Sequence, residues 1–224
     1  MIKAVVFDLF ETLITEWMSE KYLASQCAKD LGIDRDFFKA AWKRYGHALN
    51  CGEITHHQVL QNICQEADIL PDEARLSLCE QKRIAGKNQC FDCIRKDILD
   101  LLGKLKHQGL KLALCSNCSS EEVQHLFSSP LYAFFDVIIL SYQCGLEKPD
   151  PSIYFQCADA LSVSPEECLF VGDGGSRELF GAEEVGMHPL RALWFLEQYH
   201  PTFSDMPFAL AHTPDDVLLK LAGL

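Results

Sequence analysis

The sequence predicts a doubly wound parallel α/β sheet with an α-helical insert, and three features of the chain lead to this fold class. After residue 86, short apolar runs alternate with helical patterns, as they do in the βαβ units of a parallel sheet. One further apolar run, 3–9, stands near the N-terminus, and its valines and short length favour a buried parallel strand. Between these parts, residues of about 17–85 show only helical spacing.

The later part of the chain is expected to alternate strands and helices in a regular order. The expected strands are 110–115, 136–140, 168–171 and 189–194. The expected helices are 93–108, 119–127, 151–161, 177–186 and 213–223, each bound given to within a few residues. Such a sheet is covered by helices on both faces, so its strands are buried.

The segment of about 17–85 is expected to form four helices and no strand. Phe38, Ala41 and Tyr45 recur at helical spacing. Pro71-Asp72-Glu73 predicts a helix start, because proline has a suitable φ and acids are favoured at the positive end of the helix dipole. We therefore expect residues 1–15 and 87–224 to form the core and 16–86 to form an inserted cap domain.

Composition excludes several classes of partner. The chain of 224 residues has a formal net charge of −12, which argues against nucleic-acid binding that depends on phosphate neutralisation by Lys and Arg. No apolar run reaches the roughly 18 residues of a membrane span, and no secretory signal opens the sequence. We expect a cytoplasmic protein, monomeric or homodimeric, with a small-molecule substrate and no nucleic-acid or membrane partner.

Eleven cysteines fit a reducing compartment, in which most act as small buried apolar residues. Two C-x-x-C pairs, Cys90 with Cys93 and Cys115 with Cys118, leave a structural zinc site as an alternative. The favoured interpretation is coincidence in a cysteine-rich chain, because Cys115 ends a strand and Cys118 begins a helix.

Polar side chains follow four of the expected strands. In open α/β sheets, ligands bind beyond the carboxyl ends of the strands, so residues at these positions are the candidates for a shared pocket. They are Asp8, Ser116, Asn117, Lys148, Asp173 and Glu178.

The four segments that carry these residues resemble, in this order, the four motifs of the haloacid dehalogenase superfamily. Their sequences are FDLFETL, LCSN, EKPDP and VGDG, and the resemblance covers essentially the whole chain. It implies a Rossmann-like core, a cap inserted after the first strand, and a hydrolase with Asp8 as a covalent nucleophile. Attack by a side chain divides one difficult displacement into two easier steps.

The resemblance also implies a magnesium cofactor. The carboxylates of Asp8 and Asp173 and the carbonyl of Phe10 would hold Mg²⁺, with Glu178 beside the ion or bound through water. Oxygen ligands suit Mg²⁺, and the ion would screen an anionic phosphoryl group from an anionic nucleophile.

Other residues are implied to bind substrate. Ser116 and the backbone N–H of Asn117 would hold the transferred oxygens, and Lys148 would stabilise developing charge. Phe10 and, in the insert, Arg44 are further candidates for contact with the substrate.

Phe10 departs from the phosphatase pattern, which has a second aspartate there to protonate the leaving group. General acid–base help contributes about 10²–10⁴-fold. Dehalogenases of the superfamily have an aromatic residue at this position, so a 2-haloacid dehalogenase is the alternative. They also lack an aspartate at the position of Asp173, which favours hydrolysis of a small phosphorylated metabolite.

Two possibilities remain open at this point. The substrate or a histidine of the insert, His47, His56 or His57, would supply the missing proton. Alternatively, the chain is a catalytically weak binding or regulatory member of the superfamily.

Overall fold

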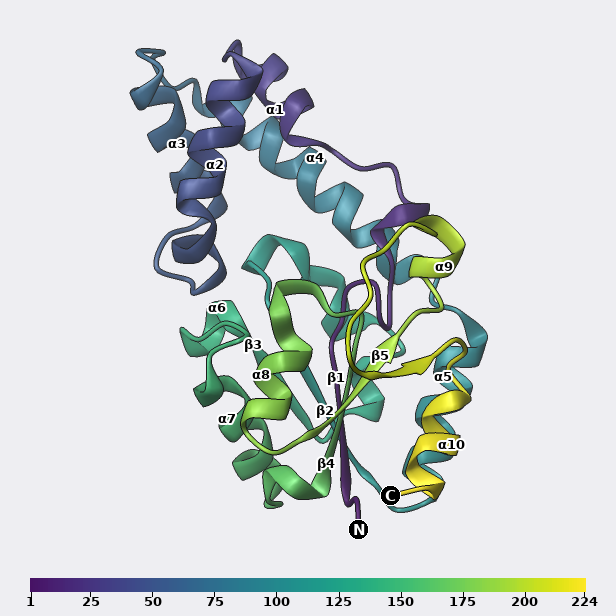
Figure 1. The fold of residues 1–224 in the computed structure, drawn as a ribbon. Coiled ribbons are helices and arrows are strands. Elements are labelled where there is room, and N and C mark those ends of the chain that lie inside the picture. Colours follow the sequence, from purple (N-terminus) through teal and green to yellow (C-terminus); the bar gives the residue numbers. More distant parts are fainter.

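A computed structural model describes all residues, 1–224, and Figure 1 shows a sheet flanked by helices with a helical insert rising from one end. The sheet has six parallel strands in the order β3-β2-β1-β4-β5-β6. The strands are β1 (Ala4–Phe7), β2 (Lys111–Ser116), β3 (Val137–Leu140), β4 (Cys168–Gly172), β5 (His188–Ala192) and β6 (Ala209–Ala211). The predicted fold class is confirmed, and β6 is an addition to it.

The central strand shows why the sheet needs a helix layer on each face. All four residues of β1 are fully buried. Val5 and Phe7 belong to one apolar core, and Ala4 and Val6 belong to another. Because successive side chains of a strand point to opposite faces, both faces must be covered.

The helices of the larger part divide between these two cores. α5 (Lys96–His107) and α10 (Asp216–Ala222) pack on one face, and α7 (Pro151–Leu161) and α8 (Glu178–Glu184) pack on the other (Figure 1). Asp150 caps α7 through a bond from the Ser152 N–H, and proline is its first residue. Two short helices complete the set: α6 (Ser141–Cys144) and α9 (Leu196–Tyr199).

The expected helix over 119–127 is wrong. Two 3₁₀ helices occupy this region, Ser120–Glu122 and Gln124–Ser128, and Val123 between them leaves helical geometry at φ −124° and ψ 21°. The side chains of Glu121 and Glu122 form ion pairs with Arg83 of the insert. Other 3₁₀ turns are Glu16–Met18, Tyr132–Phe134, Pro165–Glu167 and Gly175–Arg177.

The insert between β1 and α5 contains the four expected helices. They are α1 (Ala24–Leu31), α2 (Arg35–Asn50), α3 (His56–Glu66) and α4 (Glu73–Asp92). They enclose an apolar core of their own, which includes Phe38, Leu60 and Leu76. None of the helices in the molecule combines the length and the apolar composition that a membrane crossing demands.

The end of the insert differs from the expectation. Gly86 lies inside α4, which continues to Asp92, and the next helix begins at Lys96 rather than 93. A Cβ on Gly86 would lie 3.0 Å from the carbonyl oxygen of Glu20. The glycine therefore allows a close approach of the chain that enters the insert, and it does not break the helix.

Candidate active site

The candidate site lies where the strand order reverses, between β1 and β4. The N–H of Asp8 donates to the carbonyl of Val171 at 2.9 Å, which extends the pairing of β1 with β4 by one residue. Asp173 directly follows β4. The sheet therefore presents both carboxylates at the same edge, which is the usual ligand crevice of this type of fold.

Lys148 joins the acidic groups. Its Nζ lies 2.5 Å from Oδ1 of Asp8 and also pairs with Oε2 of Glu178. The lysine side chain is only 2% exposed. Burial by itself lowers the pKa of Lys148, but the carboxylates of Asp8 and Glu178 outweigh burial and raise this pKa well above its usual value. Lys148 is therefore a permanent cation between two carboxylates.

The acidic groups exceed the cations. Oxygens of Asp8, Asp173 and Glu178 all lie within 4.8 Å of one another. When all three carboxylates are ionised, one ammonium group leaves two negative charges in a buried space. The pKa of Glu178 is raised well above its usual value, first by burial and then by repulsion from Asp8. Burial, and then repulsion from Asp8, raise the pKa of Asp173. This set of oxygen ligands fits Mg²⁺, and a divalent cation would balance the excess charge.

The turn after β4 positions Glu178 and Asp173. Oε1 of Glu178 accepts a bond from the Gly174 N–H at 3.2 Å, and Oδ1 of Asp173 accepts one from Gly175 at 2.9 Å. Gly174 has a φ of 100°, and Ser176 also has a positive φ, of 49°. A non-glycine residue in this left-handed region is strained, and such residues cluster at functional sites.

Ser116 and Asn117 have different surroundings. The hydroxyl of Ser116 is buried and has no hydrogen-bond partner, so it is free to bond a ligand. The side chain of Asn117 instead holds the backbone of Lys148, because Nδ2 donates to the Lys148 carbonyl and Oδ1 accepts from its N–H, both at 2.8 Å. Asn117 thus positions the lysine, a role that sequence reasoning did not identify.

Phe10, two residues after Asp8, is half-buried. Its ring is 4.7 Å from Nζ of Lys87 on α4. Arg44, in contrast, is exposed and pairs with Glu66 of α3. Phe10 is therefore near Asp8 by its place in the chain, whereas Arg44 is engaged within the insert and not at the carboxylate cluster.

The three histidines of the insert make their contacts elsewhere. Nδ1 of His47 lies 2.7 Å from Oε1 of Glu147, and Nε2 of His57 lies 3.0 Å from Oε2 of Glu73. His56 is buried, and its Nδ1 has no partner. None of their hydrogen bonds is to a carboxylate of the candidate site.

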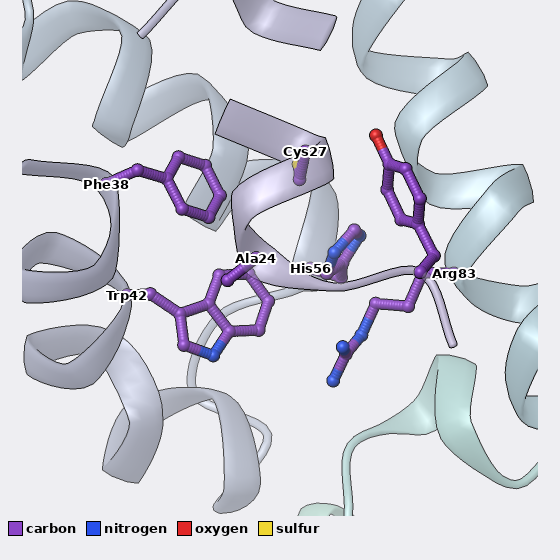
Figure 2. Close-up of a pocket in the computed structure, with 7 residues that line it drawn as sticks. Ala24, Cys27, Phe38, Trp42, His56 and Arg83 are labelled. Carbon is purple, nitrogen blue, oxygen red and sulfur yellow. The ribbon is translucent and has the colours of Figure 1, made fainter. Parts of the chain in front are cut away.

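His56 lines a cavity of about 50 Å³ inside the insert, shown in Figure 2. Its ring meets that of Trp42 edge-on at 5.5 Å, and the guanidinium carbon of Arg83 lies 5.0 Å from the centre of a Trp42 ring. Burial, and then Arg83, lower the pKa of His56 to about 3, so the imidazole is neutral. The cavity is lined by Tyr22, Ala24, Cys27, Phe38, Trp42, His56 and Arg83.

Arg83 and Lys87 also bind the insert to the core. Arg83 pairs with Glu121 at 3.0 Å and with Glu122 at 2.7 Å, and Lys87 pairs with Glu122 at 2.6 Å. Burial raises the pKa of Glu122, but Lys87 and Arg83 outweigh it and lower the pKa to about 2. These partially buried ion pairs hold α4 against the segment that follows Ser116.

Sequence reasoning missed two further neighbours of the site. Oγ1 of Thr12 donates to Oδ2 of Asp8 at 3.2 Å. Nε of Arg191, on β5, donates to the carbonyl of Asp173 at 3.0 Å. Thr12 lies in the first motif, four residues after Asp8, and this position indicated that it could contact Asp8. Nothing in the sequence distinguishes the strand of Arg191 from any other buried strand, so its contact with Asp173 could not be predicted.

Two groups of side chains converge as metal ligands do. The first is the carboxylate cluster, and the second consists of His47, Cys51 and Glu147. The cysteines of the two C-x-x-C pairs belong to neither group, and all are unpaired thiols.

Comparisons with known proteins agree with this architecture. A model of the haloacid dehalogenase-like hydrolase family matches residues 2–186. A glyceraldehyde 3-phosphate phosphatase from Methanopyrus kandleri is 33% identical over 96 residues, 42% of this chain and 41% of that protein. The chain matches only about two fifths of the length of such curated relatives.

Solved structures share the fold over a longer span. The 2-haloacid dehalogenase from Pseudomonas syringae pv. tomato has a TM-score of 0.72 at 21% identity, covering 100% of this chain and 99% of that one. A family enzyme from Bacteroides thetaiotaomicron, solved with magnesium and inorganic phosphate, has a TM-score of 0.62 at 19% identity, covering 86% and 94%.

Proposed function

This chain belongs to the haloacid dehalogenase-like hydrolase family, and from this membership we propose that it is a Mg²⁺-dependent phosphatase acting on a small phosphorylated molecule. The observation that carries the proposal is the cluster of three carboxylates around Lys148. Its excess negative charge calls for a divalent cation, and a cation next to a carboxylate nucleophile suits transfer of an anionic phosphoryl group.

Asp8 is the proposed nucleophile. Lys148 holds its Oδ1 and Thr12 holds its Oδ2, so the carboxylate plane is oriented from both sides. A carboxylate oxygen would bond to phosphorus while the bond from phosphorus to the leaving oxygen breaks. Water would then attack phosphorus and lose a proton to solvent, while the bond from phosphorus to the Asp8 oxygen breaks, so that phosphate leaves and Asp8 is restored.

The carboxylates of Asp8, Asp173 and Glu178 and the carbonyl of Phe10 would hold Mg²⁺. When bound, the ion supplies charge screening for the phosphoryl oxygens. The hydroxyl of Ser116, which has no partner within the protein, and the N–H of Asn117 would donate to the same oxygens. Lys148 would add a fixed positive charge whose position Asn117 secures.

The leaving group must depart without an aspartate at position 10. His47 and His57 are engaged with glutamates, and His56 lies in the cavity of the insert. We therefore favour a substrate whose leaving group is a weak base, such as an acyl or aryl phosphate, because such a group needs no proton from the enzyme. Loss of His56 or His57 would then leave turnover unchanged.

The helical insert, which we expected over 16–86, is proposed to act as a cap. Ion pairs of Arg83 and Lys87 place α4 beside the segments that carry Phe10 and Ser116. A cap in this position would exclude water while the substrate reacts.

Phe10 and the similarity to haloacid dehalogenase structures favour one rival, a 2-haloacid dehalogenase. One assay separates the proposals: phosphate esters with Mg²⁺, and separately 2-haloacids with chelator, each with Asp8→Asn as control. Phosphate release that Asp8→Asn abolishes supports the phosphatase, and halide release supports the rival. Release of neither phosphate nor halide, with Mg²⁺ binding retained, would indicate a binding or regulatory member of the family.

A further inference from the structure

The end of α2 contacts the core at a second place, which shares no ligand residue with the carboxylate cluster. In Figure 1, this end of α2 lies next to α6. Gly52 has a φ of 71°, and a Cβ there would lie 2.1 Å from the carbonyl oxygen of Tyr142. Only glycine fits such an approach, so the backbones of insert and core meet directly here.

Three potential metal ligands converge at this contact. His47 and Cys51 are four residues apart and therefore lie on one face at the end of α2. Nδ1 of His47 is 3.7 Å from Sγ of Cys51 and 2.7 Å from Oε1 of Glu147, which belongs to the core. All three ligand atoms lie within 4.8 Å of one another.

These separations are close to those around a tetrahedral zinc ion. Bonds of about 2.0–2.1 Å to nitrogen and about 2.3 Å to sulfur place the two ligand atoms about 3.5 Å apart. The His47–Cys51 separation of 3.7 Å matches this value. The His47–Glu147 separation of 2.7 Å is that of a hydrogen bond, and it would widen to about 3.4 Å around the ion.

Glu147 is held in the orientation that such a site needs. Nδ2 of Asn50, on α2, donates to Oε2 of Glu147 at 3.1 Å. The other oxygen, Oε1, is left facing His47. In metal sites of proteins, a hydrogen bond from a further residue to a ligand side chain, such as this one from Asn50, orients that ligand.

We propose that His47, Cys51 and Glu147 form a Zn²⁺ site that bridges the insert and the core. Thiolate, imidazole and carboxylate together are typical ligands of zinc, whereas the oxygen-only cluster at Asp8 suits Mg²⁺. Three protein ligands leave the fourth position to water. His47 is 68% exposed on its side chain, so the ion can enter from solvent.

The site would join α2 to the residue that directly precedes Lys148. A bound ion would hold the insert in the position seen in the structure and would resist its movement away from the core. This inference does not depend on the chemistry of Asp8, because no ligand is shared between the two clusters.

Cobalt titration of chelator-treated protein tests the proposal. A thiolate bound to Co²⁺ gives a charge-transfer absorption band in the near ultraviolet, which oxygen ligands do not give. We expect this band to saturate at one equivalent per chain and to vanish when Zn²⁺ displaces the cobalt. Cys51→Ser should lose the band. His47→Ala or Glu147→Gln, each of which removes a ligand, should weaken Co²⁺ binding by more than the roughly 10–100-fold that loss of a hydrogen bond to a ligand costs.

Two control variants isolate the site. Cys93→Ser removes an exposed thiol outside the cluster and should keep the band. Asp173→Asn disables the carboxylate cluster and should also keep it, so failure of the proposed Mg²⁺ chemistry would leave this result intact. A wild-type protein without the band, a band that persists in Cys51→Ser, or an unchanged Co²⁺ affinity in Glu147→Gln overturns the proposal. If Cys51→Ser does not fold, as judged by circular dichroism, the Co²⁺ affinity of Glu147→Gln decides alone.

Discussion

Nζ of Lys87 lies 4.7 Å from the centre of the Phe10 ring, so the insert places a cation directly against the residue two positions after Asp8. Glu16 and Glu122 hold this ammonium group at 2.7 and 2.6 Å. The position that carries an acidic proton donor in phosphatases of this family is thus occupied by an aromatic ring under a lysine.

Replacement of that ring tests the proposed chemistry. Phe10→Asp would introduce a carboxyl group next to Lys87 and near the leaving group. We expect kcat for alkyl phosphates to rise about 10²–10⁴-fold over wild type, the usual contribution of general acid–base help. Phe10→Asn, which has the same size and transfers no proton, should show no such rise. Equal rates for Asp and Asn at this position would contradict the phosphatase account.

Removal of the buried cation should destabilise the protein. Lys148→Met leaves the carboxylates of Asp8 and Glu178 unpaired, and breaking a buried ion pair in this way costs about 3–5 kcal/mol. We expect the free energy of unfolding, measured in urea with chelator, to fall by this amount. With Mg²⁺ present, the decrease should be smaller. Lys106→Met, which breaks an exposed pair with Asp136, should cost about 1 kcal/mol or less. A loss for Lys148→Met that Mg²⁺ does not reduce would argue against a cation site.

Gly172 provides a steric test of the carboxylate cluster. A Cβ at this position would lie 2.1 Å from Oε1 of Glu178, so Gly172→Ala must displace that carboxylate. We expect Gly172→Ala to lose most of the Mg²⁺-dependent increase in Tm. Gly46→Ala is the matched control, because nothing lies within 4 Å of its added Cβ on α2; it should keep the Mg²⁺ response and gain up to about 1 kcal/mol from helix propensity.

His56 should make stability depend on pH. The unfolded chain binds a proton at this imidazole below a pH of about 6.5, whereas the folded state, with a pKa of about 3, stays neutral. The free energy of unfolding should therefore fall as the pH is lowered through this range, by up to about 1.4 kcal/mol per pH unit. In urea unfolding from pH 7 to 4, His56→Gln should have the shallower slope. Identical slopes for the two proteins would show that His56 is not protected from protonation.

The sequence predicted the core strands well because each is short, apolar and buried. β1, β2, β3, β4 and β5 lie within one or two residues of their expected positions. β6 could not be predicted, since it has only three residues, Ala209–Ala211, of which two are exposed. The sequence does not show that α4 continues past Gly86 to Asp92, because a glycine that permits a close backbone approach looks the same in sequence as one that ends a helix.

The convergence of polar groups was predictable in part. Asp8, Lys148, Asp173 and Glu178 meet as expected, because parallel strands end at one edge of the sheet. The hydrogen bonds of Asn117 to the backbone of Lys148 and the position of Lys87 over Phe10 depend on how separate segments pack. No local pattern encodes such contacts, so only the structure could supply them.

Detection of a covalent intermediate on Asp8 would test the proposed phosphatase chemistry directly. The protein would be mixed with p-nitrophenyl phosphate and Mg²⁺, quenched in acid within the first turnover, digested and examined by mass spectrometry. We expect a phosphoryl group on the peptide that contains Asp8, absent with chelator and in Asp8→Asn. Phosphate release by Asp8→Asn at the wild-type rate, or turnover with no phosphorylated peptide at Asp8, would contradict this chemistry.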